Sequence, residues 1–219
     1  MKNIAMVVTR YGYLFLDGIK YTLILSLISV LFGTILGAGI AFMRRSRFVV
    51  VRGIATTYVE IIRGTPLLLQ LYFFYLLLPM ILPFDISAFL SVSLALVFNS
   101  AAYVSEIIRA GIQAVDKGQT EAARSLGLSG GQTMLRIVLP QAVKNILPAL
   151  CNEFVMVIKE TSLASTFFIG DIMTKYKEIS GALYLVIEPL LVAGVIYFVL
   201  TFTLSKLIAV LERRMKAHD

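Results

Sequence analysis

The 219-residue sequence is poor in the residues that build most catalytic and metal centres. It has one cysteine, Cys151, one histidine, His218, and no tryptophan. A single cysteine excludes a disulfide framework within the chain, and a single histidine excludes a histidine-rich metal site. Charged residues make up 15% of the chain, whereas a soluble domain carries about a quarter. These scarcities argue against an ordinary water-soluble enzyme.

Apolar residues are correspondingly abundant. They make up 58% of the chain, and the mean hydropathy is +0.87. Such values exclude disorder and a collagen-like chain. The net charge of +7 would suit nucleic acid in a soluble protein, but in a membrane protein the position of the charges relative to the spans is the informative quantity.

The apolar runs predict an all-α membrane protein with about five transmembrane helices in one domain, residues 1–219. A helix needs roughly 20 apolar residues to cross about 30 Å of hydrocarbon. The first run is too long and too late in the chain for a cleaved signal peptide. The fourth run is interrupted by charged residues. The predicted spans are residues 21–43, 64–82, 86–105, 145–168 and 183–211.

Basic residues predict how these spans are oriented. They gather between spans one and two, between spans three and four, and at the C-terminal end: Arg44, Arg45, Arg47, Arg52, Arg109, Lys117, Arg124, Arg136, Lys144, Lys206, Arg213, Arg214 and Lys216. Positive residues stay in the cytoplasm, so we expect the N-terminus outside and the C-terminus inside. Residues 1–20 form either an amphipathic helix on the outer surface or a frayed leader.

The hydrophilic segment of residues 116–140 predicts two short helices joined by a glycine. Thr120 is the expected N-cap of the first helix, and Gly127 the left-handed residue that ends it. Ser129 begins the second helix with a capping-box pattern, and Pro140 marks the turn back toward the membrane. Such a compact protrusion is suited to docking into a cleft of another protein.

The same segment carries a motif with fixed spacing. Glu121-Ala122-Ala123, followed by Gly127, Ile137 and Leu139-Pro140, resembles the EAA loop of ABC-importer membrane subunits. The resemblance extends over nearly the whole chain. The segments at residues 60–66 and 102–109 resemble those of polar amino-acid permeases, which are relatives of the histidine, arginine and glutamine importers.

This resemblance implies the fold of a type I importer permease in a bacterial inner or plasma membrane. It implies a coupling helix that docks on a cytoplasmic ABC ATPase, present in two copies, through Glu121, Ala122, Ala123, Arg124, Leu126 and Gly127. A second permease subunit, identical or related, completes the pathway, and an extracytoplasmic solute-binding protein delivers the amino acid. No nucleic-acid partner is implied.

The chemistry of ATP hydrolysis is not expected in this chain. A phosphate-binding loop needs the pattern Gly-x-x-x-x-Gly-Lys-Ser/Thr, and no lysine follows a glycine in that arrangement. The sequence also has no nucleophile elbow and no metal-ligand cluster. We therefore expect a non-catalytic subunit without cofactors of its own, with ATP and Mg bound by the partner ATPase.

Two carboxylates in the fourth span are the leading candidates for substrate contact. An ionisable residue inside a span costs about 2.5–3.5 kcal/mol, so each is a functional candidate. Glu153 and Glu160 lie almost two helical turns apart and project from one face; Met156 shares that stripe, and Asn152 borders it. This set suits a long cationic side chain such as that of arginine or lysine, and histidine less fully.

A structural interpretation of the same carboxylates stays open. Glu160 can pair with Lys159 or Lys175, and Glu153 with a basic group on a neighbouring helix. Lys159 points away from Glu160 if the helix is regular, because successive residues diverge by about 100°.

Two further polar residues are weaker candidates. Asn99, midway along the third span, can hold the α-carboxylate or α-amine of an amino acid, or can make an interhelical hydrogen bond. Asp85, at the outer mouth, can recruit a cation or remain a solvated loop charge.

Several other motifs predict architecture. The glycines at residues 33, 37 and 39 allow close helix approach. Glu60 and Arg63 are spaced to pair along a helix, and Pro66 loosens that helix. The Glu-Pro pair at residues 188–189 can kink the fifth span, or Glu188 can contact a ligand.

Together these features predict the transmembrane subunit of an ATP-driven, binding-protein-dependent importer of polar amino acids, specifically basic ones. An importer of glutamine or another polar amino acid is the alternative within the same class. A channel or membrane scaffold that needs no ATP is the alternative from a different class.

Overall fold

The computed structural model describes residues 2–216, and these contain helices and no β-strand. His218 lies outside the described residues. In chain order the elements are α1 (Lys2–Arg44), α2 (Val49–Gly64), α3 (Leu67–Ile81), α4 (Ala88–Gln113), α5 (Lys117–Ser125), α6 (Gly130–Thr133), a π-helical segment (Met134–Val138), α7 (Leu139–Glu160), a 3-10 segment (Thr161–Phe167), α8 (Ile172–Leu183) and α9 (Ile187–Lys216).

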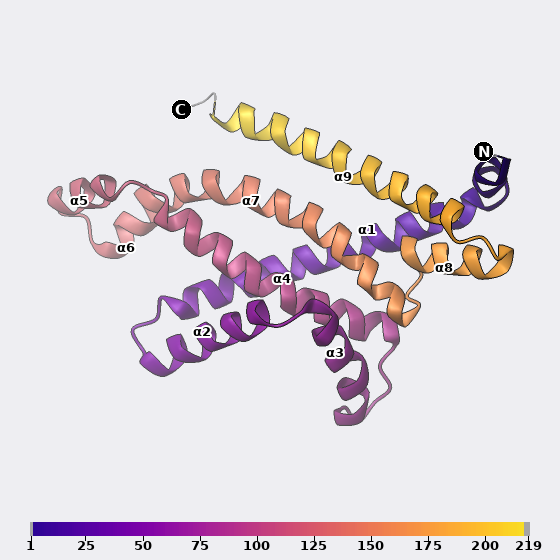
Figure 1. The fold of residues 1–219 in the computed structure, drawn as a ribbon. Helices are drawn as coiled ribbons and strands as arrows, with labels where there is room; N and C mark the ends of the chain where they lie inside the picture. Colours follow the sequence, from indigo (N-terminus) through magenta and orange to yellow (C-terminus); the bar gives the residue numbers. More distant parts are fainter. Residues whose placement is uncertain (1, 217–219) are drawn as a thin grey trace.

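The all-α membrane fold is confirmed. In the described part of the chain, four helical stretches are long and apolar enough to cross a membrane, and a fifth span results if the bent pair α2–α3 is counted as one. Figure 1 shows α5, α6, the connection between α1 and α2, and the C-terminal end of α9 at one end of the molecule; the N-terminus and α8 lie at the other. We call the first of these the coupling end.

The first helix is longer than the sequence indicated. Residues 2–20 are neither a separate surface helix nor frayed, because α1 runs without a break from Lys2 to Arg44. Val7 and Phe15 are buried in an apolar cluster with Ile172 and Ile179 of α8 and Ala193 of α9. This packing holds the N-terminal turns in line with the first span.

Close contact between α1 and α4 depends on two glycines. A Cβ atom added at Gly33 would lie 2.8 Å from the Cβ of Ser100, and one at Gly37 would lie 2.7 Å from the carbonyl oxygen of Ala101. No side chain fits at these distances, so the prediction of close helix approach is confirmed for both. Gly39 faces open space and takes no part in it.

The second predicted span, residues 64–82, is wrong in its boundaries. The chain forms two helices that meet at an angle of 109°. The break lies at Thr65 and Pro66, both with extended backbone. A proline disfavours helical geometry in the residue before it and cannot donate a backbone hydrogen bond, so the helix ends there. Pro66 therefore breaks this span rather than merely loosening it.

Two side chains hold the bend between α2 and α3. Gln70 Nε2 donates to the carbonyl oxygen of Ile62 at 2.7 Å and to Thr65 Oγ1 at 2.9 Å. Asn99 Nδ2 of α4 donates to Gln70 Oε1 at 2.9 Å. These bonds satisfy polar groups that the interrupted helix leaves without partners, and they tie the bend to α4.

The later spans also begin or end at other residues than expected. α4 continues to Gln113, well past residue 105. Pro140 does not mark a turn: it lies in the first turn of α7, where a missing N–H is tolerated, and α6, the π-helical segment and α7 follow one another without a break.

The last helix begins at Ile187 instead of residue 183, because α8 occupies residues 172–183 as a separate helix. Glu188 and Pro189 therefore lie in the first turn of α9, where proline is tolerated, and they start the helix rather than kink it. Glu188 Oε1 accepts a 2.9 Å hydrogen bond from Asn3 Nδ2.

Candidate functional site

The segment between α4 and α7 forms a projection at the coupling end, which we call the knob (residues 116–133; Figure 1). The predicted N-cap, Thr120, is wrong: Asp116 caps α5, its Oδ1 accepting from the backbone N–H of Gly118 at 2.6 Å. Thr120 therefore lies inside the helix. Gly127 adopts φ 86°, which confirms the predicted left-handed residue.

The start of the second knob helix is also as predicted. Ser129 Oγ accepts from the backbone N–H of Gln132 at 3.3 Å, and Gln132 Oε1 accepts from the backbone N–H of Ser129 at 2.9 Å. This reciprocal pair is a capping box. It fixes the direction in which α6 leaves the glycine turn.

The six predicted coupling residues do not share one face. Glu121, Ala122 and Gly127 are exposed, and Leu126 is 83% exposed. Ala123 is buried inside the knob. The knob therefore leaves one large apolar side chain, Leu126, on the surface of the single chain.

Arg124, the last of the six, braces the turn. Its Nη1 donates to the carbonyl oxygen of Leu128 at 2.6 Å, across Gly127. The residue is exposed, but its guanidinium is engaged within the knob. Its role in the single chain is therefore to stiffen the glycine turn.

Glu153 is the most deeply buried acidic residue among the predicted substrate contacts. It lies in α7 and is 9% exposed. Its Oε1 accepts one long hydrogen bond, 3.4 Å, from Ser100 Oγ of α4. Among the described residues no basic side chain pairs with it, so the predicted structural pairing of Glu153 with a neighbouring helix is not found there.

Glu160 lies at the end of α7 and is half-buried. Lys175, one of its two candidate partners, pairs instead with Glu178 at 2.9 Å. The other, Lys159, is exposed and forms no ion pair or hydrogen bond with Glu160 in the described part of the chain. The two carboxylates thus differ in their surroundings, although both lie on α7.

Of the four remaining candidates, one is buried and three are exposed. Asn99 is 4% exposed and donates to Gln70. Met156 is 48% exposed, and Asn152 is exposed on the same helix. Asp85 is exposed in the connection between α3 and α4. The structure therefore brings Glu153 against Ser100, pairs Asn99 with Gln70, and leaves Met156, Asn152 and Asp85 on the surface of the single chain.

A second cluster of charge lies where α1, α2 and α4 approach the coupling end. Glu106 of α4 is engaged by three arginines: Arg44 at 2.7 Å, Arg63 at 3.8 Å, and Arg109, one turn along the same helix. The predicted pairing of Glu60 with Arg63 is wrong. Arg63 turns to Glu106 and stacks over Tyr103, while Glu60 is exposed.

Several residues that organise these sites were not predicted from the sequence. Gln70 and Glu106 act through partners distant in the chain, which the sequence alone does not reveal. Asp171 had a local signal, because it directly precedes the apolar start of α8. It is fully buried and caps that helix, accepting from the backbone N–H of Met173 at 3.0 Å and from the Thr174 hydroxyl. Burial raises the pKa of the Asp171 carboxyl, and the hydrogen bonds oppose that effect.

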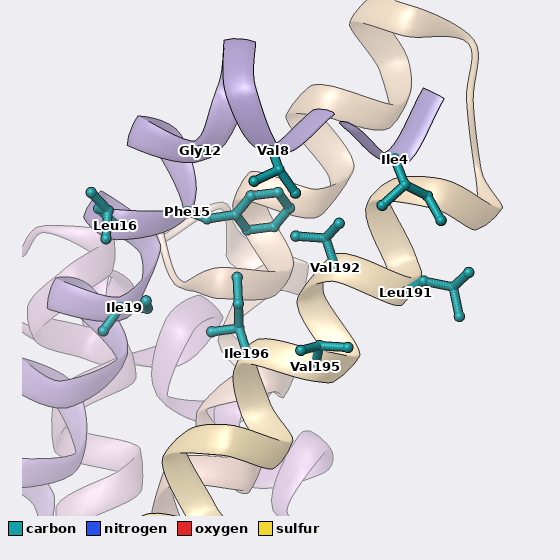
Figure 2. Close-up of a pocket in the computed structure, with 10 residues that line it drawn as sticks. All are labelled: Ile4, Val8, Gly12, Phe15, Leu16, Ile19, Leu191, Val192, Val195 and Ile196. Carbon is teal, nitrogen blue, oxygen red and sulfur yellow. The ribbon is translucent and has the colours of Figure 1, made fainter. Parts of the chain in front are cut away.

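An apolar groove of about 610 Å³ lies between the N-terminal turns of α1 and the start of α9. Figure 2 shows Phe15, Val8, Val192 and Ile196 directed into it. All ten lining residues are apolar, so the groove offers nothing to bind an amino acid's charged groups. Within residues 2–216, His, Cys, Asp and Glu side chains nowhere gather in threes that can hold a metal ion.

Comparison with known proteins places the chain in a family. The family described as "Binding-protein-dependent transport system inner membrane component" matches residues 14–217. The arginine transport system permease protein ArtQ of Bacillus subtilis is 44% identical over 204 residues, which is 93% of each chain. A putative glutamine transport system permease protein of Rickettsia conorii, GlnP, is 39% identical over 203 residues, again 93% of each.

One solved structure is similar over nearly its whole length. It is described as an amino acid ABC transporter with histidines and is 44% identical to this chain. The alignment covers 95% of this chain and 97% of that one, with a TM-score of 0.92.

Proposed function

The chain belongs to the family of binding-protein-dependent transport system inner membrane components, and we propose that it forms the membrane pathway of an importer for basic amino acids. At the coarser level, it is a permease of the polar amino-acid ABC importers. Specificity for a cationic side chain is the proposed part.

The observation that carries the proposal is the unpaired carboxylate of Glu153. A buried charge without a partner costs several kcal/mol, and the described part of the chain supplies only one long hydrogen bond from Ser100. A cationic substrate would offset that cost when it binds. The similarity to an arginine permease and to a transporter solved with histidines supports this assignment.

The other predicted contacts would support Glu153 in binding the substrate. Glu160 would add a second negative charge along the same helix, while Lys159 weakens it. Asn99 uses its amide nitrogen for Gln70, so its Oδ1 is left to accept from the substrate's α-amine. Asp85 would lie at the outer mouth and attract the cation there.

A second permease subunit, either another copy or a relative, would complete the pathway. Four or five spans are few for a translocation path. Met156 and Asn152 project from α7 on the surface of the single chain, and we propose that they face the substrate between the two subunits.

The knob would connect this pathway to its energy source. Leu126 and Glu121 are exposed at its tip, and the capping box and Arg124 make it stiff. A stiff projection transmits displacement when a partner moves it. The partner would be an ABC ATPase, in two copies, that binds ATP and Mg. The coupling end would then lie in the cytoplasm of a bacterial cell, and its basic residues support this orientation.

The direct test is uptake into proteoliposomes that contain the permease, its ATPase and its binding protein. We expect ATP-dependent accumulation of labelled arginine, lysine or histidine, and none when the ATPase is left out. Glutamine is the second candidate substrate, because several relatives are named for glutamine transport. Accumulation of glutamine but not arginine would overturn the proposed specificity and leave the family assignment intact.

The coupling role has its own test. Gly127→Asp and Glu121→Lys are expected to abolish uptake while the permease remains folded, because the first strains the left-handed turn and the second reverses a charge at the tip. Gly131→Asp is the matched control: it adds the same side chain to the knob, at a glycine with open space around it and outside the left-handed region. Normal uptake by both test variants would contradict the coupling role.

A further inference from the structure

A basic cavity of about 240 Å³ lies between α1, α2 and α4 near the coupling end. Its polar lining consists of four arginines, a glutamine and a threonine, and its apolar lining comes from α1 and α4. The four arginines are Arg44, Arg45, Arg52 and Arg109, the glutamine is Gln113 and the threonine is Thr56. Arg44 ends α1 and Arg45 directly follows it, Arg52 lies in α2 and Arg109 in α4, so cations from three separate helices meet there.

The cavity carries more positive charge than the protein compensates. Glu106 is shared among Arg44, Arg63 and Arg109, so one carboxylate faces three guanidinium groups. Within residues 2–216, the guanidinium groups of Arg45 and Arg52 form no ion pair and no hydrogen bond. Like charges held together repel one another, and the arrangement favours an anion that approaches from outside.

We propose that this cavity binds a phosphate group, either that of an anionic lipid headgroup or free phosphate. The planar guanidinium group matches phosphate oxygens with paired hydrogen bonds, and arginine keeps its charge at any physiological pH. Basic pockets between transmembrane helices at the cytoplasmic side suit lipid headgroups. Phe42, Ile108 and Ile112 line the same cavity and offer apolar surface beside the cations.

The location gives binding a mechanical consequence. A larger cavity of about 730 Å³ lies next to the knob and shares Arg45, Ile112 and Gln113 with the basic cavity. Lys117 and Arg124 of α5 line that larger cavity. A phosphate held between α1, α2 and α4 would therefore cross-link the helices at the base of the projection that the ATPase is proposed to move.

The test uses the full chain purified in detergent and requires neither ATP nor substrate, so it stands apart from the test of transport. Native mass spectrometry would count bound phosphatidylglycerol and phosphatidylcholine. Arg52→Gln is the test variant, because Arg52 forms no ion pair on which the fold depends. Arg47→Gln is the matched control. Arg47 lies just before the start of α2, stacks on Phe48 and does not line the cavity.

We expect wild type and Arg47→Gln to retain phosphatidylglycerol in preference to phosphatidylcholine. In Arg52→Gln the ratio of retained phosphatidylglycerol to phosphatidylcholine should be about fivefold lower. Displacement of the lipid by millimolar inorganic phosphate, or phosphate binding without lipid, would identify free phosphate as the ligand and also supports the site. Equal retention of both lipids together with no phosphate binding would overturn the proposal. So would an Arg52→Gln variant that melts like the control and keeps the full preference.

Discussion

Glu106 and Glu153 show two ways in which this molecule holds a carboxylate away from water. Glu106, near the coupling end, is engaged by Arg44, Arg63 and Arg109 from three helices. Glu153, in α7, accepts a single 3.4 Å hydrogen bond from Ser100. The negative charge of Glu106 is outnumbered by the positive charges of its partners. Glu153 pairs with no basic side chain within the described part of the chain.

The difference separates architecture from function. A carboxylate with three guanidinium partners fixes the relative positions of α1, α2 and α4 and has no capacity left for a substrate. A buried carboxylate with one weak partner contributes little to the fold. It can still accept hydrogen bonds from a substrate and pair with a cation. On this reasoning removal of the Glu106 charge should cost stability, whereas removal of the Glu153 charge should cost substrate binding.

Glu106→Gln is expected to have the largest effect. It leaves three arginines without their carboxylate, and the expected loss is about 3 kcal/mol in the free energy of unfolding, near the lower end for a buried pair because Glu106 is a fifth exposed. Denaturant unfolding of the purified chain measures it. Glu178→Gln is the control, since its exposed pair with Lys175 contributes at most about 1 kcal/mol. Equal stability of the two variants would contradict the architectural role.

Glu153→Gln is expected to weaken substrate binding and to leave the stability of the fold unchanged. Loss of a charge-assisted hydrogen bond of about 1.5–3 kcal/mol raises the half-saturating arginine concentration roughly ten- to hundredfold. The melting temperature should not fall, because an unpaired buried charge is removed. Uptake kinetics and thermal unfolding together check this. A drop in stability as large as that of Glu106→Gln would mean that Glu153 is structurally paired.

The neutral polar pair Gln70 and Asn99 offers an intermediate case. Gln70→Leu leaves the Ile62 carbonyl at the bend without its donor and is expected to cost about 1–2 kcal/mol of stability, with arginine uptake unchanged at saturation. Asn99→Leu should cost similar stability and also raise the half-saturating arginine concentration. If the two variants match in uptake, Asn99 is purely a partner of Gln70.

Ser100→Ala should have the smallest effect. Its hydrogen bond to Glu153 is long, so its loss is expected to change stability by about 0.5 kcal/mol and arginine affinity by roughly twofold. Thermal unfolding and uptake kinetics measure both quantities. A tenfold loss of arginine affinity would show that Ser100 itself contacts the substrate or orients the carboxylate.

Local patterns in the sequence predicted part of the local structure correctly, although the N-cap at Thr120 and the turn at Pro140 were wrong. The close approach at Gly33 and Gly37 follows from their lack of a side chain where α4 packs. The capping box at Ser129 and the left-handed Gly127 depend on residue types whose geometry is set within one or two helical turns. The EAA spacing indicated the family for the same reason: it records a compact segment whose shape is fixed by its own residues.

Features that depend on distant partners could not be predicted in this way. Arg63 was paired with Glu60 because they are neighbours on one helix, but Glu106 attracts it from another helix. The sharp bend at Pro66 is stabilised by Asn99 and Gln70, which the apolar run did not reveal. Hydropathy also ended the third span at residue 105, because it counts charges without knowing that they are paired.

The most direct measurement compares binding of arginine and of citrulline, its uncharged analogue of the same shape, to the purified permease–ATPase complex by calorimetry, without the binding protein. Wild type should prefer arginine by at least about tenfold, the factor that about 1.4 kcal/mol produces, and Glu153→Gln should bind the two alike. The same preference for arginine in both proteins would contradict the account, because the charge would then be recognised somewhere other than at Glu153.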